Sequence, residues 1–175
     1  MSRAAAPAVP VIGIVGWKKS GKTTLVVGLI EEFTRRGLKV ASVKHAHHNF
    51  QVDDQDTDSA RHRRAGAAQV AVVSARRWAL IGELGDEPEP DLAEVIGWLG
   101  PCDLVIVEGY KSQSHPKLEV HRAAVGKPLL YPSDPNIVAI ASDVRPANLK
   151  MPFADLDDIE AIADLVDDLA RPYPP

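Results

Sequence analysis

The sequence predicts an α/β protein whose strands form a mostly parallel sheet, and three observations predict it. Short apolar runs rich in β-branched residues alternate with amphipathic stretches, which is typical of parallel strands joined by crossover helices. Residues 16–23 have the spacing G-x-x-x-x-G-K-[ST] of a phosphate-binding loop. This loop follows an apolar run and precedes an amphipathic stretch, as its chemistry requires. The full prediction is a three-layer P-loop NTPase fold with an added β-hairpin region.

The first half of the chain is predicted to begin with a buried strand at 9–15 and a helix that Gly37 ends. The apolar face of that helix consists of Leu25, Val26, Leu29, Ile30 and Phe33. A strand at 38–43 follows at the distance expected of a crossover connection. The remaining elements of this half are a short basic helix at 59–65 and strand-like runs at 69–74 and 78–84.

The second half is predicted to contain two helices and three strands. Pro90 suits the first turn of a helix that continues to Leu99. The pattern Asp157-x-x-Glu160 resembles a capping box that opens a final amphipathic helix. The strands are a buried run at 103–107, an alternating and therefore half-exposed run at 118–122, and a last buried run at 136–141.

Length and composition indicate one globular domain over residues 1–175, with a leading segment at 1–9 and a tail at 172–175. A net charge of −4 gives no general attraction to nucleic acid or to anionic membranes. The single cysteine, Cys102, excludes an internal disulfide and a multi-cysteine zinc site. Residues 1–9 are too short for a signal peptide, and no run approaches the ~20 apolar residues of a membrane helix. We therefore expect a cytoplasmic protein without a nucleic-acid or membrane partner.

The loop at 16–23 has the residues that triphosphate binding needs. Gly16 and Gly21 let the backbone curl until successive N–H groups point at phosphate oxygens. Lys22 can reach the β- and γ-phosphates and acts in catalysis, and the Thr23 hydroxyl can bind Mg²⁺. An accidental glycine-rich turn is the alternative, which the flanking strand and helix disfavour. The predicted nucleotide contacts in this region are Gly16, Lys19, Ser20, Gly21, Lys22, Thr23 and Thr24.

The polar stretch after the second strand is the next candidate, because ligands of such sheets collect at the carboxyl ends of strands. Its three histidines in residues 45–48 fit a metal site, a nucleotide-facing switch loop or a plain solvated loop. On the switch-loop interpretation, His48 and Asn49 contact the nucleotide. Asp53 and Asp58 either belong to a solvated acidic loop or serve the reaction, Asp53 by contacting Mg²⁺ and Asp58 by positioning a water.

Two further strand ends carry carboxylates. Glu108 follows a buried apolar strand, where P-loop enzymes place the acid of the magnesium shell, and it is also a candidate catalytic group. Gly109 would let the backbone pass close to the γ-phosphate. Asp143 ends the last buried strand and could accept hydrogen bonds from guanine N1–H and N2–H. The alternatives are a solvated acid at Glu108 and a helix or turn cap at Asp143.

Together these segments resemble the MobB family, the accessory proteins for guanine dinucleotide synthesis on the molybdenum cofactor. The matching stretches are the phosphate-binding loop and residues 43–48, 64–69, 77–80, 107–111 and 139–143. The resemblance covers nearly the whole chain, from about residue 10 to 170, and the K-H-x-H-H and R-W-A-L elements are its most specific parts. The interior of the phosphate-binding loop is unusual in carrying two lysines, Lys18 and Lys19.

The resemblance implies a homodimeric GTP-binding protein with weak hydrolysis that partners the molybdopterin guanylyltransferase and has molybdopterin itself as a further candidate ligand. GTP and Mg²⁺ are the implied cofactors. The strands at 78–84 and 118–122 offer edges through which two copies could pair. A rival interpretation is a small-molecule kinase in which residues 61–64 form a lid and Asp53 or Asp58 activates the acceptor. A binding module with a vestigial loop is a third possibility, and it predicts no hydrolysis.

Overall fold

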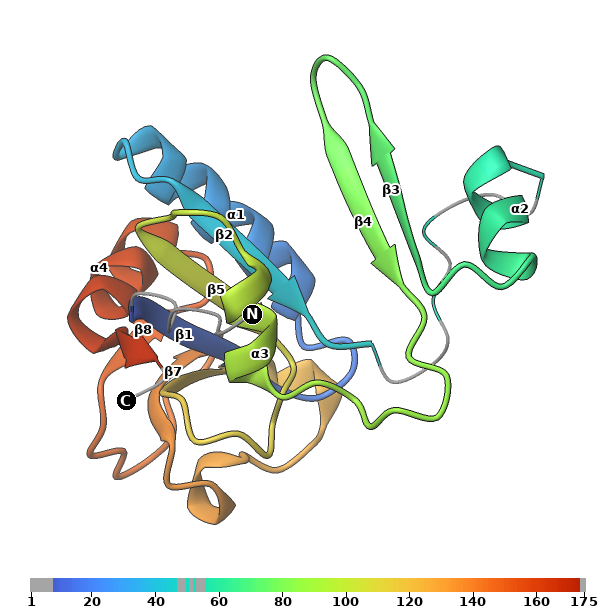
Figure 1. The fold of residues 1–175 in the computed structure, drawn as a ribbon. Helices are drawn as coiled ribbons and strands as arrows, with labels where there is room; N and C mark the ends of the chain where they lie inside the picture. The colour runs from blue at the N-terminus through green and yellow to red at the C-terminus, as the bar shows by residue number, and fades with distance from the viewer. Residues whose placement is uncertain (1–7, 47–49, 51, 53–55, 174–175) are drawn as a thin grey trace. The chain divides into compact units, whose positions relative to one another are not determined.

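The computed structural model of the chain describes residues 8–46, 50, 52 and 56–173. The chain divides into two compact units. Unit 1 consists of residues 1–45 and 92–175, and unit 2 of residues 46–91. Figure 1 shows the elements of both units in chain order. No helix among the described residues is long and apolar enough to cross a membrane.

Unit 1 is built on a mostly parallel sheet, which confirms the predicted fold class. Within the described residues the sheet has seven strands, six of them in the order β2-β5-β1-β6-β7-β8, and β9 pairs antiparallel with the start of β1. The strands are β1 Val9–Val15, β2 Val40–Lys44, β5 Leu104–Glu108, β6 Lys117–His121, β7 Ile137–Ser142, β8 Phe153–Asp155 and β9 Arg171–Tyr173. Because β1 is flanked by parallel strands on both sides, the loop that follows it lies near the middle of the carboxyl edge.

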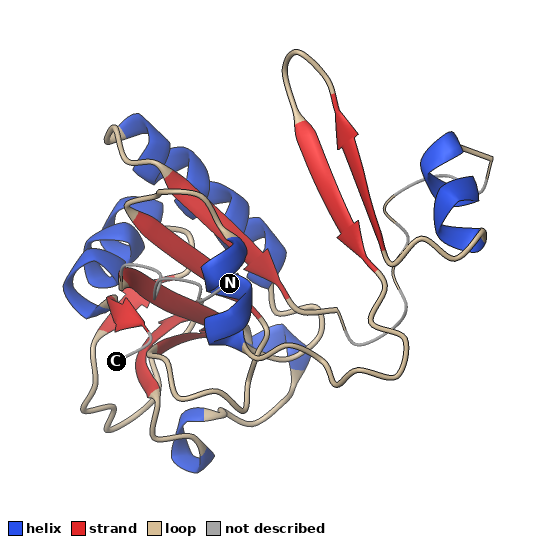
Figure 2. Cartoon of the chain, viewed as in Figure 1, coloured by secondary structure: helices blue, strands red, loops and turns tan. Residues whose placement is uncertain are grey.

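Helices cover both faces of this sheet (Figure 2). Successive side chains of a strand point to opposite faces, and β1 follows that rule. Ile12 and Ile14 pack in one cluster with helices α1 Lys22–Arg35 and α4 Ile159–Leu169. Val11 packs in a second cluster with helix α3 Leu92–Trp98. The two clusters on opposite faces make the three predicted layers.

The prediction of a half-exposed strand at 118–122 is wrong, because the strand found there, β6, is buried. It lies between β1 and β7, and its polar side chains Lys117 and Glu119 are fully buried. Lys117 Nζ donates to Asp134 Oδ2 at 2.8 Å, and the Glu119 carboxylate accepts from the backbone N–H groups of residues 130 and 131. The alternation of polar and apolar residues therefore reflects buried polar side chains that have hydrogen-bond partners inside the protein. Since both edges of β6 are occupied, the predicted pairing of two copies through this strand is wrong.

Smaller differences concern the ends of elements. Helix α4 begins after Asp158, whose carboxylate accepts from Ala161 N at 3.0 Å, so the predicted capping box is displaced by one residue. Helix α3 begins at Leu92, two residues after Pro90. The strands β8 and β9 each have three residues and were not predicted, because so short a run gives no periodicity to detect.

Unit 2 contains the predicted β-hairpin. The strands β3 Gln69–Val73 and β4 Trp78–Gly82 pair antiparallel, and helix α2 Asp58–Arg64 precedes them. The Thr57 hydroxyl caps α2 by accepting from Ala60 N. Several large apolar side chains of the hairpin are exposed to solvent, namely Val72, Val73, Trp78 and Leu80. Trp78 is 67% exposed, so the hairpin presents apolar surface instead of burying it.

Candidate functional site

The loop between β1 and α1 has a backbone that only glycine fits at two positions. Gly16 has φ 152° and Gly21 has φ 98°. A Cβ on Gly16 would collide with the Val120 carbonyl oxygen and lie 2.8 Å from Ser20 Oγ. Lys19 is also held at a positive φ, 69°, and Ser20 N donates to Trp17 O at 3.1 Å. The loop is thus tightly curled at the carboxyl end of β1, as the sequence motif predicts.

A buried polar atom lies inside this loop. Ser20 is 2% exposed, and its Oγ has no hydrogen-bond partner among the described residues. A buried hydroxyl without a partner is unfavourable by about 1–3 kcal/mol. The outer side of the loop, in contrast, is anchored, because Trp17 Nε1 donates to Pro128 O at 2.7 Å and Lys127 lies over the Trp17 ring.

Lys22 is the first residue of α1 and folds back over the loop. Its Nζ donates to Trp17 O at 2.8 Å. Burial lowers the pKa of Lys22, and the positive charges of Lys111 and Lys44 lower it further, against the opposing effect of Glu108. Lys22 thus lies within electrostatic reach of two further lysines and one carboxylate, which leaves the site with excess positive charge. An anion bound here would relieve the repulsion among them.

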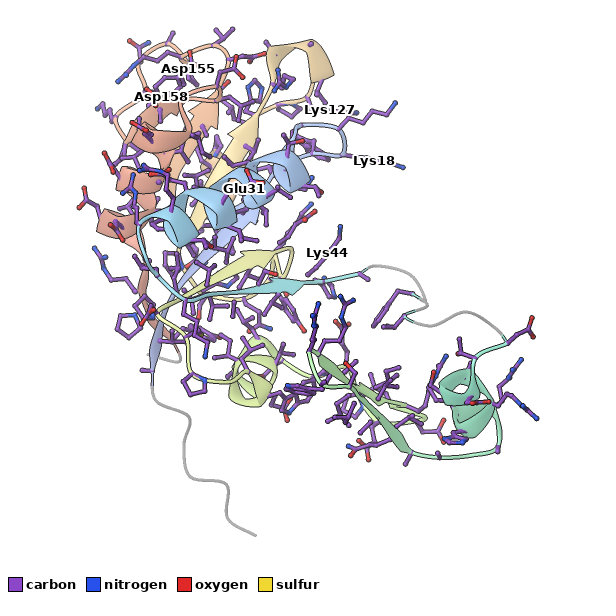
Figure 3. The ribbon with its side chains drawn as sticks, turned by 90° about the horizontal axis from the view of Figure 1, so that it is seen from above. Lys18, Glu31, Lys44, Lys127, Asp155 and Asp158 are labelled. Carbon is purple, nitrogen blue, oxygen red and sulfur yellow. The ribbon has the colours of Figure 1, made fainter. Side chains whose placement is uncertain are left out.

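The side chains of Thr23 and Glu108 meet, as their positions at adjacent strand ends predict. Thr23 Oγ1 donates to Glu108 Oε1 at 3.1 Å, and Lys44 Nζ lies 3.7 Å from Glu108 Oε2. The Glu108 side chain is only 14% exposed, so it is a largely buried carboxylate and not a solvated strand end. Figure 3 shows Lys44 at the end of β2 and Lys18 in the loop after β1. The order β2-β5-β1 brings these groups together.

A hydroxyl beside a carboxylate is a donor set that Mg²⁺ accepts, because this ion keeps several waters and takes few protein ligands. Glu108 and Thr23 fit that requirement. Among the described residues there is no group of three or more His, Cys, Asp or Glu side chains that could hold a metal ion by themselves. A metal at Thr23 and Glu108 would therefore depend on the oxygens of a bound phosphate for its remaining ligands.

Gly109 makes the sharp turn after β5. It has φ 106°, and a Cβ there would lie 2.6 Å from His45 Cβ. His45 N donates to Glu108 O at 2.8 Å, and the rings of His45 and Tyr110 are 4.6 Å apart. The close approach of the β2 end thus requires glycine at position 109. A contact of Gly109 with a γ-phosphate stays a prediction.

The other predicted site residues do not take part in the Thr23–Glu108 contact. Asp143 is exposed at the carboxyl end of β7, and its Oδ1 accepts from Ala123 N at 2.9 Å. Asp58 is the first residue of α2 in unit 2, and its side chain is 89% exposed and forms an ion pair with Arg61 at 3.6 Å. Thr24 is exposed on the first turn of α1. The predicted contacts His48, Asn49 and Asp53 lie outside the described residues.

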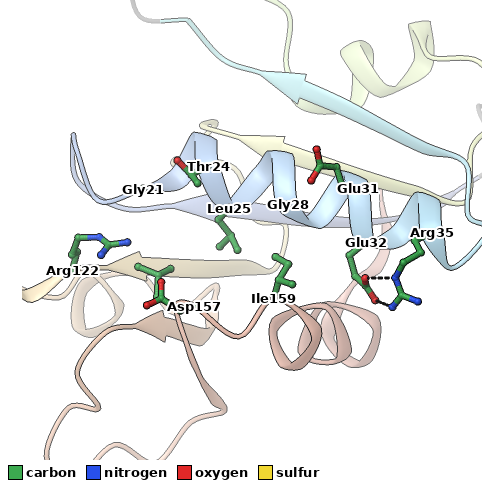
Figure 4. A pocket seen from close by; sticks show the side chains of 11 residues that line it. Gly21, Thr24, Leu25, Gly28, Glu31, Glu32, Arg35, Arg122, Asp157 and Ile159 are labelled. Carbon is green, nitrogen blue, oxygen red and sulfur yellow. Dashed lines mark hydrogen bonds and ion pairs between the residues drawn. The ribbon is translucent and has the colours of Figure 1, made fainter.

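A cavity next to the loop was not predicted from the sequence. It has a volume of ≈ 430 Å³ and lies beside Gly21 and Thr24 (Figure 4). Arg122, which follows β6, and Asp157, which follows β8, also line it. The rule that ligands collect at the carboxyl ends of strands could have indicated both residues. It failed because β6 was placed at an edge and β8 was not predicted.

The mostly parallel sheet with helices on both faces and the curled glycine loop between β1 and α1 define an α/β protein. Residues 11–143 match the sequence model of the MobB family, molybdopterin guanine dinucleotide synthesis protein B. The chain belongs to this family.

Curated relatives agree with that assignment. The chain is 38% identical over 161 residues to the molybdopterin-guanine dinucleotide biosynthesis adapter protein of Escherichia coli K12, covering 90% of this chain and 91% of that protein. It is 37% identical over 162 residues to the protein of the same name from Haemophilus influenzae, with 91% and 88% covered.

Solved structures show the same fold. A crystal structure of molybdopterin-guanine biosynthesis protein B aligns with a TM-score of 0.72 at 28% identity, covering 91% of this chain and 97% of that one. The crystal structure of a MobB homologue from Bacillus stearothermophilus aligns with a TM-score of 0.65 at 27% identity, covering 90% and 98%.

Proposed function

We propose that this chain is a GTP-binding adapter in molybdopterin-guanine dinucleotide biosynthesis, with slow GTPase activity, that assists the guanylyltransferase. The single observation that carries nucleotide binding is the contact of Thr23 with Glu108 beneath a curled loop rich in lysine. The adapter role is supported by the names of relatives that match 90% or more of the chain. A cytoplasmic location fits the single, free cysteine.

The proposed binding mode assigns a task to each group. Backbone N–H groups of the loop and the N-terminus of α1 bind the phosphates, with Lys19 and Ser20 as further contacts. Lys22 leaves Trp17 O and reaches the β- and γ-phosphates. Thr23 and Glu108 hold Mg²⁺, which supplies charge neutralisation at the terminal phosphates. The Ser20 hydroxyl gains the partner that it lacks among the described residues.

Slow hydrolysis is part of the proposal. Lys22 stabilises charge on the phosphates, Glu108 would do so through the Mg²⁺ that it holds, and Asp58 is the proposed water-positioning group. Efficient P-loop GTPases also need an arginine that contacts the phosphates, and a partner's arginine is worth roughly 10³–10⁵ in rate. We assign no such arginine in this chain. Turnover is therefore proposed to rise only in the complex with the guanylyltransferase.

The hairpin of unit 2 is the proposed route to a homodimer. The described strands of this sheet pair only with each other, so each has one edge available, and Trp78 and Leu80 are exposed beside it. Edge strands with exposed apolar side chains favour pairing with another chain. Molybdopterin itself is a candidate ligand of the assembled complex.

The phosphate-binding part of the proposal is tested by calorimetric titration of the full chain with GTP and ATP in the presence of Mg²⁺. Lys22→Ala is expected to weaken GTP binding at least about tenfold, since it removes a charged contact worth about 1.5–3 kcal/mol. Lys18→Ala, in the same loop, is the matched control. Equal affinity of wild type and Lys22→Ala for GTP would contradict nucleotide binding at this loop.

The adapter part is tested by co-purification with the guanylyltransferase and by GTPase assays with and without that enzyme. Association and faster turnover in its presence are expected. Fast hydrolysis by the isolated chain with no association would favour an independent enzyme. A phosphorylated small molecule in the reaction mixture would favour the kinase interpretation.

A further inference from the structure

The cavity beside the phosphate-binding loop is large enough for the nucleoside half of a nucleotide. Its volume of ≈ 430 Å³ lies within the range of roughly 300–1,000 Å³ that small-molecule sites occupy. It begins at Gly21 and Thr24, so it is continuous with the place where the phosphates are proposed to bind. A triphosphate held by the loop would leave its ribose and base next to Thr24.

The floor of the cavity is apolar. Leu25, Leu156 and Ile159 line it, and a Cβ on Gly28 would lie 3.0 Å from Ile159 Cδ1. The helices α1 and α4 thus approach closely beside the cavity at Gly28. A flat aromatic base can cover such a floor while its polar edge stays free for other groups.

The walls near the loop carry two charged side chains, Arg122 and Asp157, which Figure 4 shows at the end of the cavity occupied by Gly21 and Thr24. Arg122 Nη2 lies 3.7 Å from the position of a Cβ on Gly21. Its guanidinium group therefore adds positive charge beside the loop. Glu31, Glu32 and Arg35 line the opposite end.

Three acids lie between the end of β8 and the start of α4, namely Asp155, Asp157 and Asp158, and only Asp157 lines the cavity. Asp155 Oδ1 accepts from Asp157 N at 2.9 Å, and Asp158 Oδ1 caps α4. Both of those carboxylates therefore have structural roles. The Asp157 carboxylate has no hydrogen bond to any described residue, while its backbone is fixed by Asp155.

Asp143 is used differently. Its Oδ1 accepts from Ala123 N, the residue next to Arg122. That bond fixes the start of the segment that carries Arg122 to the end of β7. Asp143 is therefore suited to position Arg122, and the free carboxylate at the cavity belongs to Asp157.

We propose that this cavity binds the ribose and base of the nucleotide and that the Asp157 carboxylate selects guanine. The inference rests on the proposed nucleotide-binding function. A carboxylate accepts from guanine N1–H and N2–H together, in a charge-assisted pair. Adenine presents an unprotonated N1 at that edge and offers no such pair. The selection of guanine over adenine thus follows from one side chain.

The experiment exchanges the carboxylate for an amide in the full chain. Asp157→Asn is expected to weaken GTP binding about 10–100-fold, because the lost charge-assisted bonds are worth about 1.5–3 kcal/mol. It is expected to strengthen binding of xanthosine triphosphate, whose N1–H and O2 match an amide. Affinity for ATP is expected to stay constant, which reports that the variant is folded. Asp158→Asn is the matched control, since asparagine caps a helix as well as aspartate does.

The outcomes separate this inference from the function on which it rests. If the wild type binds GTP and Asp157→Asn keeps the wild-type preference for GTP over xanthosine triphosphate, the role of Asp157 is overturned. The proposed function is then left intact. A shift of that preference in Asp143→Asn alone would assign the base contact to Asp143 instead. Failure of the wild type to bind any nucleoside triphosphate would overturn both proposals.

Discussion

The two units of the chain treat charged and apolar side chains in opposite ways. Unit 1 buries Lys117 and Glu119 completely and gives each of them hydrogen-bond partners. Unit 2 exposes Trp78 and Leu80 on a two-stranded sheet. A two-stranded sheet is marginal by itself, since it has no second layer to bury its face. Unit 1 therefore has the packed core that a ligand site needs, whereas unit 2 presents surface suited to a partner.

Three glycines in the sheet and the site loops of unit 1 show the same contrast with unit 2, whereas Gly37, Gly97, Gly100 and Gly126 of unit 1 have open space around them. In unit 1 an added Cβ on Gly13, Gly16 or Gly109 would meet another atom at less than 3.0 Å. In unit 2 an added Cβ on Gly66, Gly82 or Gly85 would meet nothing within 4 Å. Interiors at crystal-like density have no room for one more methyl group. The site therefore lies in the unit whose positions are fixed by packing.

The largest expected effect is the loss of a partner for a buried charge. Burial raises the pKa of Asp134, but hydrogen bonds from Lys117 and Asn136 outweigh it and hold that pKa below its usual value. Asp134→Ala leaves Lys117 buried inside unit 1 without its carboxylate partner and with only Lys111 O as acceptor, so it is expected to lower the free energy of unfolding by about 3–5 kcal/mol. Urea denaturation followed by circular dichroism measures this change.

The control for that prediction is the ion pair of unit 2, in which Arg63 Nη1 lies 2.6 Å from Glu83 Oε1. The Glu83 side chain is 47% exposed. Glu83→Ala is expected to change the free energy of unfolding by less than about 1 kcal/mol, because exposed pairs contribute little. Similar losses for the two variants would show that the units do not differ in the way their charges are held.

The second prediction concerns pH. Burial lowers the pKa of His115 to about 4, the Lys117 charge lowers it too, and Asp134 opposes them. Between about pH 6.5 and 4, His115 is protonated in the unfolded chain but neutral in the folded protein. The free energy of unfolding therefore decreases as pH falls through this range. The loss approaches about 3 kcal/mol, at 1.36 kcal/mol for each unit of pKa.

Urea denaturation at several pH values checks this. His115→Leu is expected to have a flatter dependence on pH than wild type between pH 7 and 4. The same substitution at His62, exposed on α2, is the comparison in unit 2 and is expected to keep the wild-type dependence. An unchanged slope in His115→Leu would mean that His115 does not carry the effect.

Much of unit 1 was predictable because its signals are local in the chain. The loop at 16–23 is a contiguous motif, and apolar runs marked β1, β5 and β7 as buried. The sequence also placed Glu108 at the end of β5, and the structure brings it to Thr23. Hydrophobic periodicity reports burial well when the buried residues are apolar.

The errors arise where burial depends on residues distant in the chain. Lys117 is buried because Asp134, 17 residues later, pairs with it, and no periodicity reports that. The cavity could not be predicted for the same reason, because its lining residues are distant from one another in the chain. Arg122 and Asp157 become neighbours of Gly21 only through the order β1-β6-β7-β8, which places the ends of distant strands side by side.

The smallest expected effect compares one methyl group in the two sheets. Gly13 in β1 and Gly82 in β4 are both strand residues, and neither has a positive φ. A Cβ on Gly13 would collide with His115 Nε2 and lie 2.8 Å from His115 Cδ2. Gly13→Ala is therefore expected to lower the free energy of unfolding by about 1–3 kcal/mol, as overpacking does. In a domain of this size each kcal/mol lowers the melting temperature by about 2–4 °C, which thermal unfolding measures.

Gly82→Ala is expected to leave stability within about 0.5 kcal/mol of wild type, since its methyl group enters open space. A double-mutant cycle then tests the cause of the loss at Gly13. In the background of His115→Ala the ring that the new methyl group would strike is gone, so Gly13→Ala should become less destabilising than it is in wild type. An equal loss with and without the His115 ring would place the strain in the backbone of β1 instead of in the packing between β1 and His115. Close packing would then no longer explain the difference between the two units at this position.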